Sequence, residues 1–255
     1  MLNIISAHYE GESDANVNAD AIANIAAVAD NIGGGSDDTE WITRSLESIT
    51  FPEGITEIGN FAFAGMDNLE SIEIPNTVTR IGQGAFAYTE LTDVVIPENV
   101  VSVGNGIFEY CSSLTSVTLL TNTKIIPART FYCCTGITNF TIPPTIATID
   151  NEAFEGSGIT SLTSDNSLRI SDRAFFETSL ESVTLPHVKT IGNQCFADNW
   201  DLETVEIGSD ILRIGEDAFE NCDSLATITI NKAEGSITGA PWGAPSSTQI
   251  IWTGE

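Results

Sequence analysis

The sequence has few basic residues: nine Lys and Arg stand against 36 Asp and Glu, which gives the 255-residue chain a formal net charge of -27. Nucleic-acid binding depends on Lys and Arg side chains that neutralise phosphates, so this composition argues against a nucleic-acid partner. An anionic membrane surface would repel the chain for the same reason. The excess of carboxylates favours cationic or neutral partners.

Long apolar segments are also absent. No stretch approaches the roughly 18 uncharged apolar residues of a transmembrane helix, so we expect no membrane insertion. Residues 1–8 lack the basic start and the apolar run of a signal peptide, which predicts a chain without an export signal.

Catalytic and metal-binding groups are scarce. The only His residues, His8 and His187, have no motif beside them that would position a base, and neither a Gly-x-Ser-x-Gly elbow nor a Gly-x-x-x-x-Gly-Lys phosphate loop occurs. The five Cys residues lack the spacing of a zinc site, and their odd number argues against a disulfide framework. The acidic cluster at residues 216–223 does not match a calcium loop and indicates a solvated rim. We therefore expect no enzyme, no cofactor and no metal site.

What the sequence has in abundance is repetition. A period of 21 to 23 residues predicts a solenoid, in which each repeat forms one coil and neighbouring coils cover its faces. Apolar residues three and five positions after the opening residue predict a short strand. Pro often ends this strand, as at Pro75 and Pro97, because it lacks the donor that a continuing ladder needs. The opening residues are Leu46, Leu69, Leu91, Leu114, Ile137, Ile159, Leu180, Leu202 and Leu225.

A second signature follows the turn, as in Ile81-Gly82-Gln83-Gly84-Ala85-Phe86. Its first Gly is expected at a corner that needs a positive φ angle, and the corners with Pro127 or Asp150 in its place are expected to differ. Its Phe recurs once per repeat and predicts a stacked aromatic column in the core. We call these residues the column phenylalanines: Phe63, Phe86, Phe108, Phe131, Phe154, Phe175, Phe196 and Phe219.

Four of the five cysteines keep a fixed distance from a column phenylalanine. Cys111, Cys134 and Cys222 follow one by three residues, Cys195 directly precedes one, and Cys133 is the fifth. These positions indicate small buried side chains. Cys111 and Cys134 occupy equivalent positions in adjacent repeats, and we expect them to be close but reduced.

The repeats resemble the BspA-like leucine-rich repeat family, whose unit is approximately Leu-x-x-Val-x-Ile-Pro followed by Val-x-x-Ile-Gly-x-x-Ala-Phe-x-x-Cys. The resemblance covers residues 46 to about 252. It implies an α/β solenoid, a right-handed coil of eight repeats made mostly of short β-strands, that acts as a non-catalytic macromolecular recognition or adhesion module. Two repeats depart from the pattern: Leu120 stands where Pro is usual, and Ser164-Asp165-Asn166 replaces Ile-Pro. We expect irregular packing at residues 163–171.

The two ends differ from the repeats. Residues 1–40 are predicted to form an acidic arm, and residues 41–255 the solenoid with a C-terminal cap at residues 232–255. Within the arm, residues 16–32 predict a helix that ends at a Gly-rich joint, and its apolar stripe must cover the first coil or dock onto a partner chain or a second copy. The stripe consists of Ala21, Ile25, Val28 and Ile32.

The C-terminal segment is expected to add a closing strand, with Trp242 and Trp252 shielding the last Phe layer. The small helix, the Gly-rich joint and the ending Ala240-Pro241-Trp242-Gly243 also resemble proteins of phage and prophage tail regions. That resemblance implies an alternative function: a structural component of a phage or phage-like particle, docked through its N-terminal helix. The expected location is an extracellular surface or a virion, and otherwise the cytoplasm.

Two surfaces are candidates for a protein or glycan partner. Outward residues of the first strands form a mostly uncharged Thr ladder, which by itself stabilises stacked strands. The other surface follows the Phe column, where Tyr88, Tyr110 and Tyr132 fall in consecutive repeats, with Phe176 and Trp200 further along. Such aromatic residues either pack over the column or form an exposed contact patch. We take the three Tyr residues as the predicted partner-binding residues.

Overall fold

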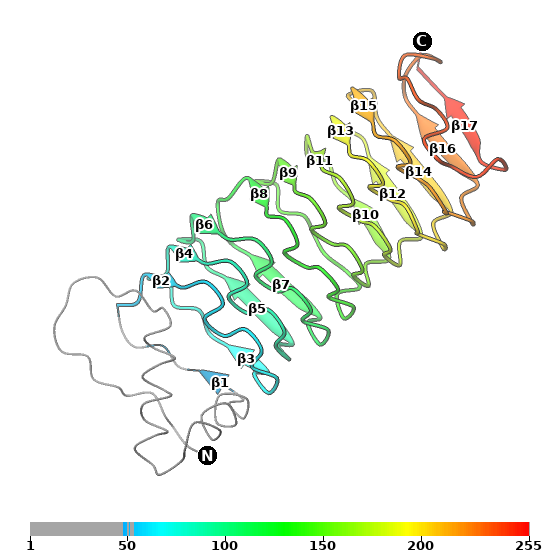
Figure 1. Cartoon of the computed structure of the whole chain (residues 1–255). Coiled ribbons are helices and arrows are strands. Elements are labelled where there is room, and N and C mark those ends of the chain that lie inside the picture. The colour runs from blue at the N-terminus through cyan, green and yellow to red at the C-terminus, as the bar shows by residue number, and fades with distance from the viewer. Residues whose placement is uncertain (1–47, 50, 52–53, 255) are drawn as a thin grey trace. The chain divides into compact units, whose positions relative to one another are not determined.

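The repeats form coils, each with up to two short strands joined by turns, as the computed structural model shows (Figure 1). The structure describes residues 48–49, 51 and 54–254. These form two compact units, unit 1 up to Asn122 and unit 2 from Thr123 onward. The predicted helix at residues 16–32 and its Gly-rich joint lie outside the described residues, so the division into arm and solenoid stays a prediction. Strands and turns without helices make up the described part, which therefore holds no membrane-spanning helix.

Unit 1 contains two parallel sheets. Their strands pair with a register shift of one repeat, as in Ser48 opposite Ser71 and Arg80 opposite Ser102. The first sheet has the order β1 (Ser48–Ile49), β3 (Ser71–Ile72), β5 (Asp93–Ile96) and β7 (Ser116–Leu119). The second has the order β2 (Glu57–Ile58), β4 (Arg80–Ile81) and β6 (Ser102–Val103).

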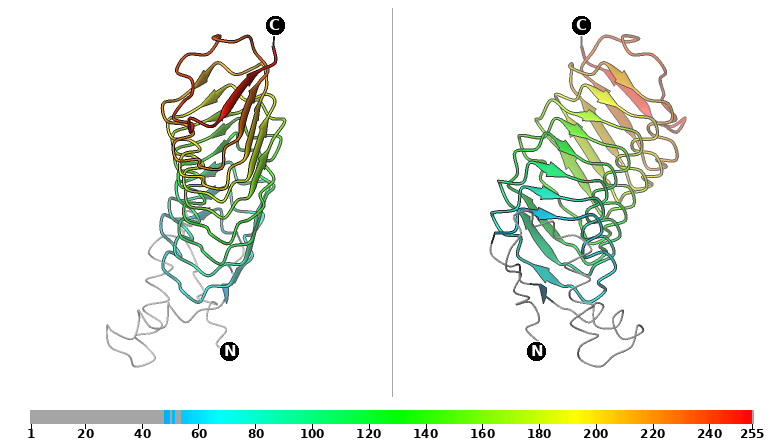
Figure 2. Two further views of the ribbon diagram at one scale, coloured as in Figure 1. Left: turned by 90° about the vertical axis from the view of Figure 1, so that its right-hand side faces the viewer. Right: turned by 60° about the vertical axis from the view of Figure 1, so that its left-hand side comes forward.

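Unit 2 repeats this plan, with its two sheets on different sides of the coils (Figure 2). Its longer strands alternate outward and buried residues, as the sequence pattern predicts. The first sheet has the order β10 (Ser161–Thr163), β12 (Ser182–Leu185), β14 (Thr204–Ile207), β16 (Thr227–Ile230) and β17 (Gln249–Trp252). The second has the order β15 (Arg213–Ile214), β13 (Thr190–Ile191), β11 (Arg169–Ile170), β9 (Thr148–Ile149) and β8 (Ile125–Ile126).

The C-terminal cap agrees with the sequence. Strand β17 pairs in register with β16, which confirms the predicted closing strand. Trp242 is buried, and its ring lies 6.3 Å from the ring of Trp252. The carbonyl of Trp242 accepts a hydrogen bond from the amide of Phe219 at 3.0 Å, so the cap continues the hydrogen bonding of the last coil.

Both atypical repeats form backbone hydrogen bonds to a neighbouring coil at residues that depart from the pattern, Leu120 at the Pro position and Ser164 at the preceding Ile position. The amide of Leu120 donates to the carbonyl of Ile96, and the amide of Ser164 donates to that of Thr184. The Asn166 side chain then donates to the carbonyl of Pro143 at 2.7 Å. The irregular packing expected at residues 163–171 is therefore limited to a strand one residue shorter than its neighbours in the sheet.

One coil of unit 2 lacks its first strand, at residues 138–142. Phe140 stands there at the inward position that Ile, Leu or Val occupies in the other coils. Its ring lies 5.2 Å from the rings of both Phe131 and Phe154. The Phe140 ring is wider than an aliphatic side chain and packs against the aromatic column. The backbone of this segment forms no strand.

The predicted aromatic column is confirmed within each unit. In unit 1, the ring of Phe86 stacks 5.6 Å from Phe63 and 5.7 Å from Phe108. In unit 2, five rings follow one another at 4.9, 5.1, 5.6 and 5.7 Å between centroids. Every column phenylalanine except Phe63 is fully buried, and Phe63 is nearly so. The column therefore forms the centre of each core.

The expectation of positive φ at the recurring Gly is wrong. The φ angle is not positive at Gly82, Gly104, Gly192 or Gly215. Instead, a Cβ atom at Gly82 would stand 2.5 Å from the backbone nitrogen of Asn60, and one at Gly215 would stand 2.4 Å from the carbonyl carbon of Gly192. The repeat needs Gly at this corner because adjacent coils approach too closely for any side chain.

Positive φ angles occur instead two residues before and two residues after each column phenylalanine. We call the segment from two residues before to four residues after a column phenylalanine a turn ridge. An L-residue in this left-handed conformation costs about 1 to 2 kcal/mol, whereas Gly adopts it freely. Gly fills four of these sixteen positions, at Gly65, Gly84, Gly106 and Gly156. The other twelve are Phe61, Tyr88, Tyr110, Arg129, Cys133, Glu152, Arg173, Glu177, Gln194, Asp198, Asp217 and Asn221.

Replacing Glu177 with Gly is expected to stabilise the protein. Glu177 is exposed at a φ of 53°, the ridge position that Gly156 occupies in the preceding coil. Relief of the left-handed conformation should exceed the entropic cost of Gly and raise the free energy of unfolding by about 0.5 to 1 kcal/mol. Urea titration measures the change. The control is Glu181→Gly, which removes the same charge from an exposed site without positive φ and should lower the free energy of unfolding. Equal effects of the two substitutions would contradict the prediction.

Candidate recognition surface on the turn ridges

The Thr ladder is present on the first sheet of unit 2. Thr163, Thr184, Glu206 and Thr229 stand in one row, in register across four strands. Thr163 and Glu206 are exposed, and Thr184 and Thr229 are half-buried. The row carries one charge and no aromatic side chain, so it offers hydrogen-bonding groups but no large apolar contact area.

The exposed aromatic side chains lie on the turn ridges instead. Phe61 is 55% exposed, Tyr88 52%, Tyr110 40% and Trp200 54%. These are the large aromatic residues with the greatest exposure in the described chain. The ridges therefore hold the contact area that protein and glycan interfaces favour.

Tyr88 and Tyr110 form a stacked pair on unit 1. Their ring centroids are 4.8 Å apart and the ring planes differ by 18°. Both residues have a φ of 59°, so the left-handed backbone directs these side chains out of the core. The amide of Tyr88 donates to the carbonyl of Glu109 at 2.8 Å, which joins the two coils beside the rings.

The residue after each Tyr forms a buried hydrogen bond to the backbone of the column. Thr89 and Cys111 are buried, and both donate to the carbonyl of Phe86, at 2.9 Å from the Thr89 Oγ1 and 3.1 Å from the Cys111 Sγ. These two side chains also lie 3.3 Å apart. The exposed rings thus stand on a backbone that buried hydrogen bonds hold in place.

Tyr132 differs from the other two Tyr residues. It belongs to unit 2 and follows its column phenylalanine by one residue, whereas Tyr88 and Tyr110 follow theirs by two. Cys133 occupies the equivalent position in that coil. Tyr132 is half-buried, and the guanidinium carbon of Arg129 lies 3.9 Å from its ring centroid. The structure therefore pairs two of the three predicted residues, and gives the third a cation–π contact within its own unit.

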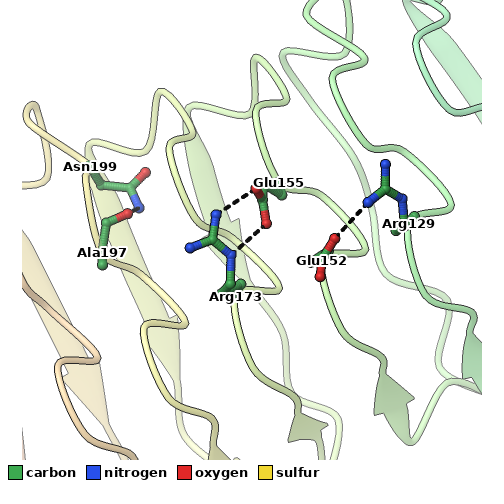
Figure 3. A network of polar contacts seen from close by, with 6 residues as sticks. All are labelled: Arg129, Glu152, Glu155, Arg173, Ala197 and Asn199. Carbon is green, nitrogen blue, oxygen red and sulfur yellow. Dashed lines mark hydrogen bonds and ion pairs between the residues drawn. The ribbon is translucent and has the colours of Figure 1, made fainter.

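A polar network that the sequence did not reveal lies on the ridges of unit 2 (Figure 3). The Arg173 guanidinium binds the Glu155 carboxylate with two hydrogen bonds, at 3.0 Å from Nε to Oε2 and 2.7 Å from Nη2 to Oε1. Hydrogen bonding to Glu155 raises the pKa of Arg173. The guanidinium also lies 3.6 Å from the ring centroid of Phe176. Arg129 and Glu152 form a second ion pair, at 2.9 Å.

The pair of Glu155 and Arg173 was missed because its contacts run diagonally between coils, whereas Arg129 and Glu152 occupy equivalent positions in adjacent coils. Glu155 follows its column phenylalanine by one residue, whereas Arg173 precedes the next one by two. An alignment of repeats compares equivalent positions and does not detect such a pair. The available signal is compositional: two of the nine basic residues, Arg129 and Arg173, occupy the same ridge position two coils apart.

The position three residues after the column phenylalanine holds a hydrogen-bond donor in several coils. The buried Asn199 amide donates to the carbonyls of Phe175 and Phe196, both at 2.8 Å, and Figure 3 shows it beside Ala197. The Cys222 thiol donates to the carbonyl of Phe196 at 3.0 Å. The cysteines at this position are therefore buried, as predicted, and Cys111 and Cys222 also satisfy backbone carbonyls.

All five cysteines are expected to be reduced and, with one exception, slow to react. Burial raises the pKa of the thiols of Cys111 and Cys195, and raises that of Cys222 to about 12, so little reactive thiolate forms near pH 8. The half-buried Cys133 should be alkylated first in the native protein. Intact-mass measurement without reductant should find five modified thiols in denaturant. A disulfide between Cys111 and Cys134 would contradict the prediction.

The acidic residues of the described chain do not converge on an ion site. Among residues 48–49, 51 and 54–254, no three His, Cys, Asp or Glu side chains come together in a way that could hold a metal ion. This includes the cluster at residues 216–223, where Glu220 accepts a hydrogen bond from Gln194 at 3.4 Å.

Coils of short parallel strands around an aromatic column define each unit as a repeat solenoid. The chain matches the family model described as BspA type leucine rich repeat region (6 copies) over residues 40–160 and 148–240. It therefore belongs to the BspA-type leucine-rich repeat family. No curated protein matches the chain.

Solved structures with the same fold include a leucine rich cell surface protein from Faecalibacterium prausnitzii. It shares 22% sequence identity with this chain and has a TM-score of 0.51, with 83% of this chain and 61% of that protein covered. The chain thus spans less than two thirds of that relative. A leucine-rich repeat protein from Bacteroides ovatus shares 19% identity, with a TM-score of 0.45 and coverage of 82% and 78%. The pneumococcal vaccine antigen PcpA shares 16% identity, with a TM-score of 0.47 and coverage of 80% and 73%.

Proposed function

We propose that this chain is a non-catalytic recognition or adhesion module that binds a protein or glycan at an extracellular surface through Tyr88, Tyr110 and Tyr132. The stacked pair of Tyr88 and Tyr110 carries the proposal. Their rings are among the most exposed aromatic groups of the described chain, and buried hydrogen bonds hold the backbone beneath them.

The rigidity of this pair supports a binding role. A side chain that is already ordered loses little conformational entropy when a partner binds, and immobilising a mobile one costs about 0.5 to 1.5 kcal/mol. Tyr combines a large apolar ring with a hydroxyl group, and interfaces are enriched in it for that reason. The name of the Faecalibacterium relative describes a cell surface protein, which agrees with the proposed location.

The triple substitution of the three Tyr residues by Ala tests the proposal. The probes are an array of immobilised extracellular-matrix proteins and a printed glycan array. We expect the variant to keep its circular dichroism spectrum and to lose at least tenfold in affinity for whichever probe the native chain binds.

A matched control replaces Val95, Val101 and Leu212 with Ala, because these apolar side chains are exposed and lie outside the ridges. It should bind like the native chain. Equal binding by the folded triple Tyr variant and the native chain, or no binding by the native chain to either array, would overturn the proposal.

A further inference from the structure

We propose that Asn105 is a site of covalent self-modification, at which the amide nitrogen of Gly106 attacks the Asn105 side chain and converts it to isoaspartate and aspartate. Asn105-Gly106 is the only Asn-Gly pair of the chain. The surroundings of both residues in unit 1 support the inference, which is independent of the recognition function.

The reaction needs water and no cofactor. Hydroxide takes the proton of the Gly106 amide, the nitrogen bonds to the side-chain carbonyl carbon of Asn105, and the side-chain nitrogen takes up a proton from water and leaves as ammonia. The product is a succinimide ring, which one water molecule opens at either carbonyl. Breaking the bond from nitrogen to the side-chain carbonyl carbon gives aspartate. Breaking the bond from nitrogen to the backbone carbonyl carbon gives isoaspartate, in which the chain continues through the side chain.

The Asn105 side chain is exposed, and it has no hydrogen bond in the part of the chain that the structure describes. Two other Asn residues follow the corner Gly of their coils as Asn105 does, and both are held by the next coil. The Oδ1 atom of Asn60 accepts a hydrogen bond from the amide of Gln83 at 2.8 Å. The Oδ1 atom of Asn193 accepts one from the amide of Glu216 at 3.0 Å. Asn105 lacks this restraint, so its side-chain carbonyl carbon can turn toward the following amide.

The attacking amide is unpaired as well. At this ridge position the amide commonly donates to the neighbouring coil, as Gly84 does to the Asn105 carbonyl at 2.9 Å and Arg173 does to the Asn193 carbonyl at 3.0 Å. The described residues provide no acceptor for the amide of Gly106, which is buried. An unpaired buried N–H group is unfavourable. Ring closure removes it, because the nitrogen of a succinimide carries no hydrogen, and Gly has no Cβ atom to hinder the attack.

Asn166 provides an internal comparison. It precedes Ser167, another small residue, but its side-chain amide donates to the carbonyls of Pro143 at 2.7 Å and Ile146 at 3.1 Å. These bonds must break before the side chain can meet the next amide. We therefore expect Asn105 to be converted at least about tenfold faster than Asn166, because orientation of the reacting groups controls the rate of an intramolecular reaction.

Isoaspartate adds a methylene group to the backbone at a corner that has no room for it. A Cβ atom at Gly104 would stand 2.4 Å from the backbone nitrogen of Gln83, and the Asn105 carbonyl accepts the hydrogen bond from Gly84. The longer backbone displaces this carbonyl from its donor. Loss of one backbone hydrogen bond should lower the melting temperature by about 2 to 4 °C.

The experiment follows the full chain by peptide mapping and mass spectrometry during incubation at neutral and at mildly alkaline pH. A protease that cleaves before aspartate but not before isoaspartate distinguishes the two products. A synthetic peptide of residues 102–109 gives the rate without the fold. Asn105→Gln is the matched control, since its longer side chain would have to close a larger ring. Asn105→Asp introduces the charge without lengthening the backbone.

We expect the native chain to form isoaspartate at Asn105 at a rate within about tenfold of that of the free peptide, and the rate to rise in proportion to the hydroxide concentration. Asn105→Gln should show no conversion and keep its melting temperature after incubation. Asn105→Asp should melt like the fresh native chain, whereas the converted native chain should melt at a lower temperature. The proposal is overturned if Asn105 in the folded chain reacts more than about tenfold slower than the peptide, or if Asn166 reacts as fast as Asn105.

Discussion

Truncating Phe154 to Ala is expected to lower the free energy of unfolding by about 3 to 5 kcal/mol. The ring is fully buried and contacts three others, at 4.9 Å from Phe131, 5.1 Å from Phe175 and 5.2 Å from Phe140. The substitution removes apolar surface from the core, and the column restricts relaxation because rings on both sides are held by their own coils. The remaining cavity therefore adds to the lost transfer free energy. Phe131→Ala should cost a similar amount.

Urea titration followed by circular dichroism measures both effects. Trp200→Ala provides the matched control, because it removes a larger aromatic side chain from the surface of the same unit and should change the free energy of unfolding by less than about 1 kcal/mol. A loss below about 1 kcal/mol for Phe154→Ala would show that this residue does not occupy the interior of the column.

Replacing Arg173 with Ala is expected to destabilise the protein by about 2 to 4 kcal/mol. The Glu155 side chain is 9% exposed, so removing its partner leaves a nearly buried carboxylate without a counter-charge. The Arg173 side chain is 34% exposed. We therefore expect a loss of stability toward the lower end of the range for breaking a fully buried ion pair. The substitution also removes the guanidinium that covers Phe176.

A double-mutant cycle separates the pair from its surroundings. Replacing Glu155 and Arg173 together with Met should restore most of the lost stability, because no buried charge remains. Arg129→Ala is the control, since this Arg occupies the same ridge position and its ion pair with Glu152 is more exposed; its loss should cost about 0 to 1 kcal/mol. If Arg173→Ala costs no more than Arg129→Ala, the burial of Glu155 has no energetic consequence.

The sequence by itself determined the repeat architecture. Apolar strand residues and a Phe recur at fixed spacing in eight repeats. This recurrence predicts strands, an aromatic column and a closing strand, because a solenoid places equivalent residues on top of one another. Phe154 could be assigned to the core from its spacing alone. The family could be recognised for the same reason, since its consensus describes the positions that stacking makes equivalent.

The tertiary structure decided what depends on distances between non-equivalent positions. Gly82 and its counterparts are required by the approach of the next coil, whereas the left-handed angles fall at Tyr88 and at other residues that no local rule marks. The different phase of Tyr132, in contrast, is a property of the sequence: Tyr132 follows its column phenylalanine by one residue and Tyr88 follows its own by two.

The same holds for contacts that run diagonally between coils. Arg173 meets Glu155 because adjacent coils are displaced by one strand spacing along the axis. A one-dimensional repeat specifies which residues share a column. Only the three-dimensional stacking determines which side chains of neighbouring columns are close enough to interact.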